Sequence, residues 1–183
     1  DKLHERKNIF QRPNVTNLDY AIIVASIVEP KLDTLLIDKF ITIFQSNKIE
    51  PIIVFTKHDL AQEADMKLVN EYREAGFKTI IKHVEDITKL EGMIKDSFSV
   101  VTGQTGVGKS TLLNDLEQGL ALKTGEISHR LGRGKHTTRH AEAFEIFEGS
   151  FIVDTPGFSS LVVEDLEPGD VPTFFHNFRE LAT

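Results

Sequence analysis

Apolar runs alternate with amphipathic stretches along this chain, which is the pattern of β-strands separated by α-helices. We expect strands, several of them near-continuous apolar runs, over 20–28, 50–57, 77–84, 97–103, 142–149 and 150–157. We expect helices over 30–47, 61–75, 86–96, 109–118 and the last dozen residues. The run 142–149 alternates polar and apolar residues as an edge or antiparallel strand does. The sequence therefore predicts an α/β fold, with a mostly parallel sheet and helices on both faces.

The stretch "GQTGVGKST", residues 103–111, follows one of these strands and opens a helix. It matches the phosphate-binding pattern Gly-x4-Gly-Lys-Ser in full and predicts a P-loop NTPase. Backbone N–H groups of such a loop surround the β-phosphate, and the helix presents its positive end. Lys109 is expected to reach the β- and γ-phosphate oxygens, and Ser110 to bind Mg²⁺. The expected nucleotide contacts here are Gly103, Gln104, Thr105, Gly106, Val107, Gly108, Lys109, Ser110 and Thr111.

The motif "DTPG", residues 154–157, also follows an apolar strand. Asp154 is expected to hold Mg²⁺, mostly through water, and the N–H of Gly157 to meet the γ-phosphate. Ligands of parallel sheets bind beyond the carboxyl ends of the strands. We therefore expect this motif and the P-loop to lie at the same edge of the sheet.

The motif "TKHD", residues 56–59, ends another buried strand. A carboxylate there can accept the N1–H and the exocyclic N2–H of guanine, a donor pair that adenine lacks. Asp59 is therefore expected to select guanine, with Lys57 along the base and Thr56 completing the motif. The other interpretation is an exposed turn in which Asp59 caps the helix after residue 60.

The stretch "HRLGRGKHTTRH", residues 129–140, is basic and contains no acidic residue. A Thr hydroxyl in it could complete the Mg²⁺ shell when a γ-phosphate is present, which would make the loop a switch. The same cations could contact RNA phosphates. The plainest interpretation is a solvated loop.

Composition limits the class of protein. The 183 residues carry a net charge of −7, which argues against nucleic-acid binding driven by overall charge. The absence of Cys excludes disulfides and thiolate zinc sites within this chain. There is no long apolar run and no signal-peptide core, so we expect a cytoplasmic protein that does not bind membranes.

The order of the motifs resembles that of a known family. "TKHD" precedes "GQTGVGKST", which is followed by "GKHTT" and "DTPGFSS", whereas most GTPases carry the base motif last. This order, and the entry "RPNVTNLDYAIIVAS", resemble the circularly permuted bacterial GTPases called ribosome-small-subunit-dependent GTPase A. The resemblance covers nearly all of residues 8–180.

The resemblance implies a domain organisation. It implies a circularly permuted GTPase domain over 13–165, with residues 1–12 as the tail of an N-terminal β-barrel domain. Residues 166–183 would be the helical start of a truncated zinc-module region, and zinc is expected only in the part of that module that is missing from this sequence. The chain would then be part of a longer protein, and a monomer.

The resemblance also implies an activity. This is Mg²⁺-dependent hydrolysis of GTP to GDP, coupled to late maturation of the small ribosomal subunit and stimulated by that subunit and its rRNA. The implied catalytic residues are His136, which orients water, Thr138, which binds Mg²⁺, and Lys109. Phe158 stands where many GTPases have a water-orienting Gln, so we expect slow intrinsic turnover.

Two departures keep alternatives open. The stretch 82–92, "KHVEDITKLEG", lacks the Ser of the family's guanine loop, and Thr56 stands where Asn is commonest. A second hypothesis is therefore a GTP/GDP-gated ribosome-binding module with negligible hydrolysis. A third is an ATP-dependent P-loop enzyme in which "TKHD" is a coincidence.

Overall fold

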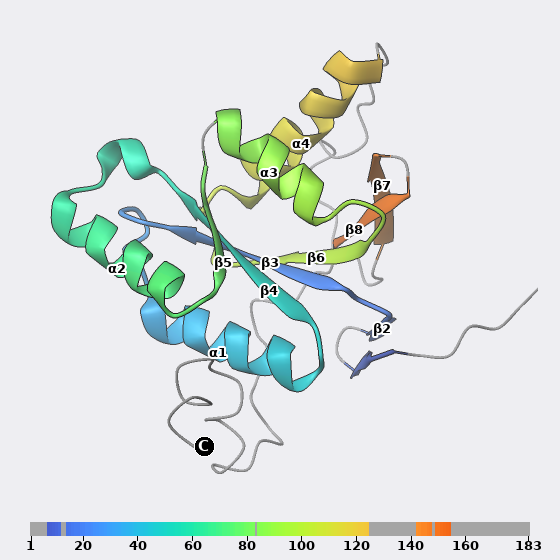
Figure 1. Ribbon diagram of the computed structural model, residues 1–183, viewed down its shortest axis with the longest axis horizontal. Helices are drawn as coiled ribbons and strands as arrows, with labels where there is room; N and C mark the ends of the chain where they lie inside the picture. The colour runs from blue at the N-terminus through green and yellow to red at the C-terminus, as the bar shows by residue number, and fades with distance from the viewer. Residues whose placement is uncertain (1–6, 12–13, 83, 125–141, 148, 155–183) are drawn as a thin grey trace, which may run out of the picture.

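A computed structural model describes residues 7–11, 14–82, 84–124, 142–147 and 149–154. Its main element is a six-stranded sheet in the order β5-β4-β3-β6-β8-β7 (Figure 1). The strands are β3 (Tyr20–Ser26), β4 (Glu50–Thr56), β5 (Lys78–Ile81), β6 (Phe98–Thr102), β7 (Glu142–Phe147) and β8 (Ser150–Asp154). All neighbouring strands are parallel except β7 and β8, which pair antiparallel. The predictions of a mostly parallel sheet and of an antiparallel strand at its edge are confirmed.

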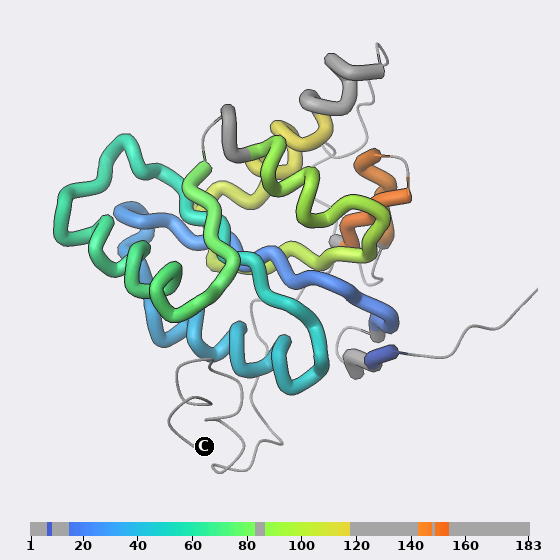
Figure 2. The backbone as a smooth tube through the Cα atoms, viewed as in Figure 1, coloured from blue at the N-terminus to red at the C-terminus, as the bar shows by residue number. Residues whose placement is uncertain are grey.

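Helices cover both faces of the sheet, as predicted. Helices α1 (Thr34–Ser46) and α2 (Glu63–Glu74) lie on one face, and α3 (Val84–Met93) and α4 (Lys109–Thr124) on the other (Figures 1 and 2). A short 3-10 helix, η1 (His58–Leu60), follows β4. None of the helices in these described ranges is long and apolar enough to cross a membrane.

The near-continuous apolar strands are explained by burial on two sides. Successive side chains of a strand point to opposite faces of the sheet. Ile23 and Phe55 belong to the core under α1 and α2, whereas Ile22 and Val54 belong to the core under α3 and α4. Phe40 of α1 packs in the first core. Because each of these strands has a hydrophobic core on both faces, its residues do not alternate between apolar and polar.

Helix α1 begins at Thr34 rather than at residue 30. Asp33 is its N-cap and accepts a hydrogen bond from the N–H of Leu36 at 3.0 Å. Before it, the Ser26 hydroxyl donates to the carbonyl oxygen of Glu29 at 2.8 Å and accepts from the Glu29 N–H at 3.0 Å. These bonds hold residues 26–29 in a turn, so the apolar spacing predicted the helix but not its start.

Two other predicted boundaries are also wrong. Strand β5 ends at Ile81 rather than 84, because α3 already begins at Val84. Helix α4 continues to Thr124, beyond the predicted end near 118. Gly119 lies inside this helix, although glycine lowers helix propensity by about 1 kcal/mol.

A hairpin that the sequence did not predict precedes the sheet. Strands β1 (Ile9–Gln11) and β2 (Asn14–Thr16) pair antiparallel. The side chain of Asn8 donates to the Leu18 carbonyl oxygen at 2.7 Å and accepts from the Leu18 N–H at 3.0 Å. The two strands of the hairpin therefore lie on either side of the boundary at residue 12 where we expected the β-barrel tail to end, and Asn8 fastens the hairpin to Leu18, just before β3.

Candidate functional site

The loop between β6 and α4 has the backbone of a phosphate cradle. Gly103, Gly106 and Gly108 have φ values of +143°, +82° and +97°. A Cβ atom on Gly103 would lie 2.2 Å from the carbonyl oxygen of Val24, a distance that no side chain can accept. The glycine therefore lets the loop lie directly against β3. Loops of this kind turn backbone N–H groups inward and form concavities that bind anions.

Lys109 folds back over this loop. Its Nζ atom donates to the carbonyl oxygens of Gly103 and Gln104, both at 2.6 Å. The ammonium therefore lies over the loop, beside the first turn of α4. That turn adds the positive end of the helix dipole. Ser110 and Thr111 follow in the same turn and are exposed. The positive charge of Lys109 and the N-terminal end of α4 thus meet at one point, which suits the phosphates of a nucleotide.

The base motif touches the phosphate loop directly. The Thr56 hydroxyl donates to the carbonyl oxygen of Val107 at 2.6 Å, although the two residues are 51 positions apart. Thr56 is only 3% exposed. A Cβ atom on Gly108 would meet its methyl carbon at 3.7 Å. Thr56, the first residue of the base motif, therefore links this motif directly to the phosphate loop.

Lys57 and Asp59 complete the motif at the end of β4. Lys57 has a left-handed backbone, with φ of 57°, and its Nζ atom donates to the carbonyl oxygen of Glu29. Asp59 lies in η1 and is exposed. It does not cap the following helix: the N-cap of α2 is Gln62, whose N–H donates to Asp65 at 2.9 Å. The interpretation of Asp59 as a helix cap is therefore wrong, and its carboxylate faces solvent at the edge that carries the P-loop.

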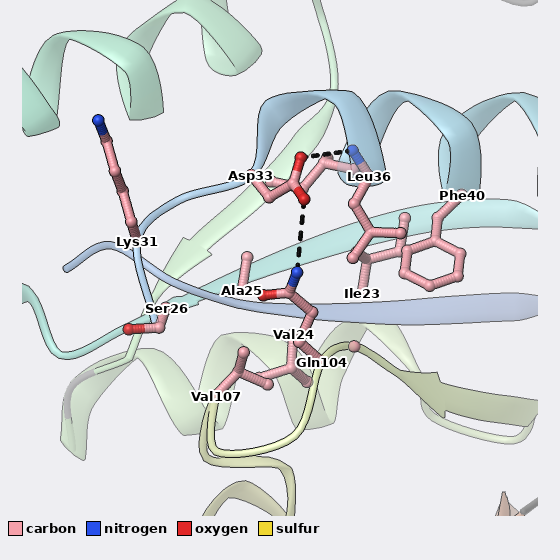
Figure 3. A pocket seen from close by; sticks show the side chains of 12 residues that line it. Ile23, Val24, Ala25, Ser26, Lys31, Asp33, Leu36, Phe40, Gln104 and Val107 are labelled. Atoms are coloured by element: carbon pink, nitrogen blue, oxygen red, sulfur yellow. Dashed lines mark hydrogen bonds between the residues drawn. The ribbon is translucent and has the colours of Figure 1, made fainter. Parts of the chain in front are cut away.

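A small pocket lies on the α1 side of the phosphate loop (Figure 3). Ile23 and Phe40 line its apolar part, and Gln104 and Asp33 lie at its polar end. The Gln104 amide donates to Asp33 at 3.4 Å, while the other Asp33 oxygen caps α1 at Leu36. The side chain of Gln104 is therefore turned toward α1, so only its backbone remains for a phosphate.

The end of β5 departs from the guanine loop that the resemblance implies. The N–H of Lys82 donates to the carbonyl oxygen of Phe55 at 2.7 Å, so it is used within the sheet. The Nζ atom of Lys82 pairs with the Asp115 carboxylate of α4 at 2.6 Å. Sequence reasoning did not find this pair, because 33 positions separate the two residues and no local pattern connects them.

The remaining predicted site residues are described only in part. Asp154 is the last residue of β8, which pairs with β6, so its backbone lies at the end of the strand beside the phosphate loop. Its side chain lies outside the described part of the structure, and so do His136, Thr138, Gly157 and Phe158.

Mg²⁺ fits the donors present at this edge. Among the residues that the structure describes, no three His, Asp or Glu side chains are grouped so that they could hold a metal ion. Mg²⁺ in nucleotide sites needs only one or two protein oxygens, because phosphates and water supply the others. The exposed hydroxyl of Ser110, in the turn after Lys109, is an oxygen donor of the required kind.

Comparisons with known proteins agree with this site. The family model described as RsgA GTPase matches residues 3–164. The Small ribosomal subunit biogenesis GTPase RsgA of Bacillus cytotoxicus is 44% identical, covering 98% of this chain and 63% of the relative. The protein of the same name from Thermotoga petrophila is 39% identical over 96% of this chain and 61% of its own. The chain thus spans less than two thirds of the length of these relatives.

Two solved structures share the fold. The crystal structure of YjeQ from Thermotoga maritima is 31% identical, with a TM-score of 0.76 over 95% of this chain and 60% of that one. YloQ, described as a circularly permuted GTPase, is also 31% identical, with a TM-score of 0.73 over 98% of this chain and 58% of that one. The early base motif and the later phosphate loop, joined at Thr56, are therefore those of a circularly permuted GTPase fold, and the chain belongs to the RsgA GTPase family.

Proposed function

We propose that this domain binds GTP with Mg²⁺ and hydrolyses the bond between the β- and γ-phosphates. The observation that carries the proposal is the hydrogen bond from Thr56 to Val107, because it joins a base-selecting motif to a phosphate loop. A P-loop alone would fit any nucleoside triphosphate. With Asp59 at the same edge, a carboxylate faces the N1–H and N2–H donors that distinguish guanine from adenine.

The phosphates take the positions that the loop prepares. Backbone N–H groups of residues 103–108 hold the β-phosphate, and Lys109 exchanges its carbonyl partners for β- and γ-phosphate oxygens. Mg²⁺ would be held by Ser110, together with Asp154 and Thr138 as the sequence implies. When bound, it supplies neutralisation of the charge that develops on the phosphate oxygens.

The water that attacks the γ-phosphate needs a group to orient it. Phe158 cannot donate or accept a hydrogen bond, and His136 is the candidate that the resemblance to the family supplies. A GTPase that carries a water-orienting Gln still turns over alone at only about 10⁻⁴ s⁻¹. We therefore expect slow intrinsic hydrolysis that a partner accelerates.

The partner proposed is the small ribosomal subunit with its rRNA. The proposal rests on the relatives, whose name assigns them to biogenesis of that subunit. It implies action in the cytoplasm, late in maturation of the subunit, and we take the chain to act as a monomer. The β-barrel before residue 13 and the zinc module after 165 are likewise proposals, since the relatives are longer than this chain.

A second candidate function is a nucleotide-gated ribosome-binding module with negligible hydrolysis. The observation that favours it is the end of β5, where the Lys82 N–H is bonded to Phe55 and no Ser loop is present. An ATP-dependent enzyme is the third candidate, and competition between guanine and adenine nucleotides tests it.

Single-turnover hydrolysis of GTP, with and without purified small ribosomal subunits, tests the proposal. Strong stimulation by the subunits is the expected result. Binding of both GTP and GDP without any stimulated hydrolysis, by this chain and by a longer protein that includes it, would favour the gated module instead.

A further inference from the structure

A short ion pair crosses from the sheet to the phosphate-loop helix. The Nζ atom of Lys82, directly after β5, lies 2.6 Å from the Asp115 carboxylate of α4. The two side chains are 20% and 36% exposed, so the pair is largely shielded but still open to a ligand. The other described ion pairs, Lys7 with Asp19 and Lys78 with Glu50, are longer, and their lysines are more exposed than Lys82.

The pair lies beside the base motif. Ile81 is the register partner of Phe55, and the Lys82 N–H donates to the Phe55 carbonyl oxygen at 2.7 Å. Lys82 is therefore level with Thr56 on the neighbouring strand, a separation of about 4.8 Å. Asp115 lies six residues after Lys109 on α4, a rise of about 9 Å. The ammonium thus lies between the end of β4, which leads into η1 and Asp59, and helix α4, which begins at the phosphate loop.

Guanine has a further hydrogen-bonding group besides the N1–H and N2–H donors that Asp59 is proposed to bind. Its O6 atom is an acceptor next to N1–H, on the same edge of the ring, and it needs a donor. The Lys82 backbone N–H cannot be that donor, because it is bonded to Phe55. The ammonium has three N–H donors, of which the bond to Asp115 uses one.

We propose that Lys82, held in place by Asp115, donates a hydrogen bond to O6 of guanine. Lys82 is then a specificity-determining residue, and Asp115 a positioning residue that acts through it. If adenine bound instead, the Lys82 ammonium would face its 6-amino group. Both groups are hydrogen-bond donors, so adenine binding is disfavoured. This inference rests on the proposed function, since it assumes a guanine nucleotide in the site.

The test compares GDP with 6-thio-GDP, which keeps N1–H and N2–H but replaces O6 with a weakly accepting sulfur. Affinities are measured by displacement of a fluorescent GDP from the unchanged chain and from Lys82→Met. We expect Lys82→Met to weaken GDP about tenfold, as the loss of a charge-assisted hydrogen bond does, and 6-thio-GDP less than about twofold. Lys82→Arg keeps a donor and should restore part of the preference for GDP.

Lys78→Met is the matched control, because it makes the same change at the first residue of β5 and also breaks an ion pair, with Glu50 at 2.8 Å. It should leave both affinities unchanged. Asp115→Asn should reduce the preference for GDP over 6-thio-GDP by a smaller factor than Lys82→Met.

If Lys82→Met weakened the binding of GDP and of 6-thio-GDP by the same factor, the inference would be overturned, because the ion pair between Lys82 and Asp115 would then only hold α4 in place. Unchanged affinities would overturn it as well. If the unchanged chain bound no GDP, the proposed function itself would fail, and the inference with it.

Discussion

The hydroxyl of Thr56 lies 2.6 Å from the carbonyl oxygen of Val107, and this bond connects the end of β4 to the middle of the phosphate loop. Asparagine is commonest at this position of the base motif. Threonine is shorter, yet its hydroxyl reaches the loop, since β4 lies next to β3 and the loop lies against Val24 of β3. The substitution therefore keeps a link between the two motifs.

Thr56→Val should weaken both the fold and the site. The change replaces the hydroxyl with a methyl group of similar size, and it leaves the Val107 carbonyl oxygen without this donor. We expect the free energy of unfolding to fall by about 1–3 kcal/mol, and GDP affinity to fall about tenfold. Chemical denaturation and nucleotide displacement measure the two effects.

Thr42→Val is the control for this change. Thr42 is also buried, but its hydroxyl donates to the backbone carbonyl oxygen of Asp38, one turn earlier in α1, at 2.8 Å. It should leave GDP affinity unchanged. Equal affinities for Thr56→Val and the unchanged chain would show that the bond does not shape the site.

Two Gly→Ala changes should have opposite effects on stability. At Gly103 the new Cβ atom would lie 2.2 Å from the Val24 carbonyl oxygen, at a φ of +143°. The loop must move, so we expect a loss of about 3 kcal/mol or more and loss of nucleotide binding. At Gly92, within α3, a Cβ atom meets nothing within 4 Å. There alanine should stabilise the chain by about 0.5–1 kcal/mol. Thermal unfolding of both variants checks the signs.

Asp38 should make stability depend on pH. Burial raises its pKa above the ordinary value of 3.8, and the hydrogen bond from the Tyr72 hydroxyl, at 2.9 Å, opposes part of this shift. A carboxyl with a raised pKa holds its proton more tightly in the folded state. Its contribution to stability is therefore present below pH 3.8 and is lost as the pH rises through the folded-state pKa.

Asp38→Asn should remove this loss. The amide oxygen can still accept from Tyr72, and no charge is buried. We expect a higher free energy of unfolding at pH 7 than in the unchanged chain, with little difference at pH 3. Urea unfolding across this range measures it, and a variant that is less stable at pH 7 would contradict the argument.

Asp59→Asn should change the preferred base. The amide can no longer accept both N1–H and N2–H of guanine, but it can donate to the O2 carbonyl of xanthine. GDP affinity should fall at least about tenfold, while the affinity for xanthosine diphosphate rises. Asp65→Asn, at the start of α2, should leave the preference for guanine intact. If Asp59→Asn lost affinity for both guanosine and xanthosine diphosphate, Asp59 would support the structure of the loop rather than bind the base.

His136→Ala should affect hydrolysis without affecting binding. If His136 orients water, its loss should slow GTP turnover on small ribosomal subunits about 10²–10⁴-fold. GDP affinity should not change. His129→Ala, in the same basic stretch, serves as the matched control. Unimpaired turnover in His136→Ala would exclude this role.

The sequence predicted what local patterns encode. Strands such as β3 and β4 were found because burial on both faces leaves them uniformly apolar. The hairpin β1–β2 was missed because bonds from Asn8 to Leu18, ten positions away, fasten it. The predicted start of α1, at residue 30, was wrong because the hydroxyl of Ser26 stabilises a turn that the spacing of apolar residues does not reveal.

The candidate site shows the same division. "GQTGVGKST" gave the phosphate loop, because glycine and lysine spacing in this loop follows from its backbone. The contacts between motifs, from Thr56 to Val107 and from Lys82 to Asp115, could not be predicted, because they join segments that only the sheet brings together.

The strand order β5-β4-β3-β6-β8-β7 also divides the domain by chain order. The first half of the chain builds β3, β4 and β5, and the second half builds β6, β7 and β8, so in the described sheet the two halves are joined by the pairing of β3 with β6. In the proposed function, the first half carries the base-selecting motif and the second half carries the phosphate loop. A ribosome making this chain would therefore complete the half that reads the base before the phosphate loop emerges. A nucleotide bound to the folded domain would contact both halves, and its binding would therefore increase the free energy of unfolding of the domain.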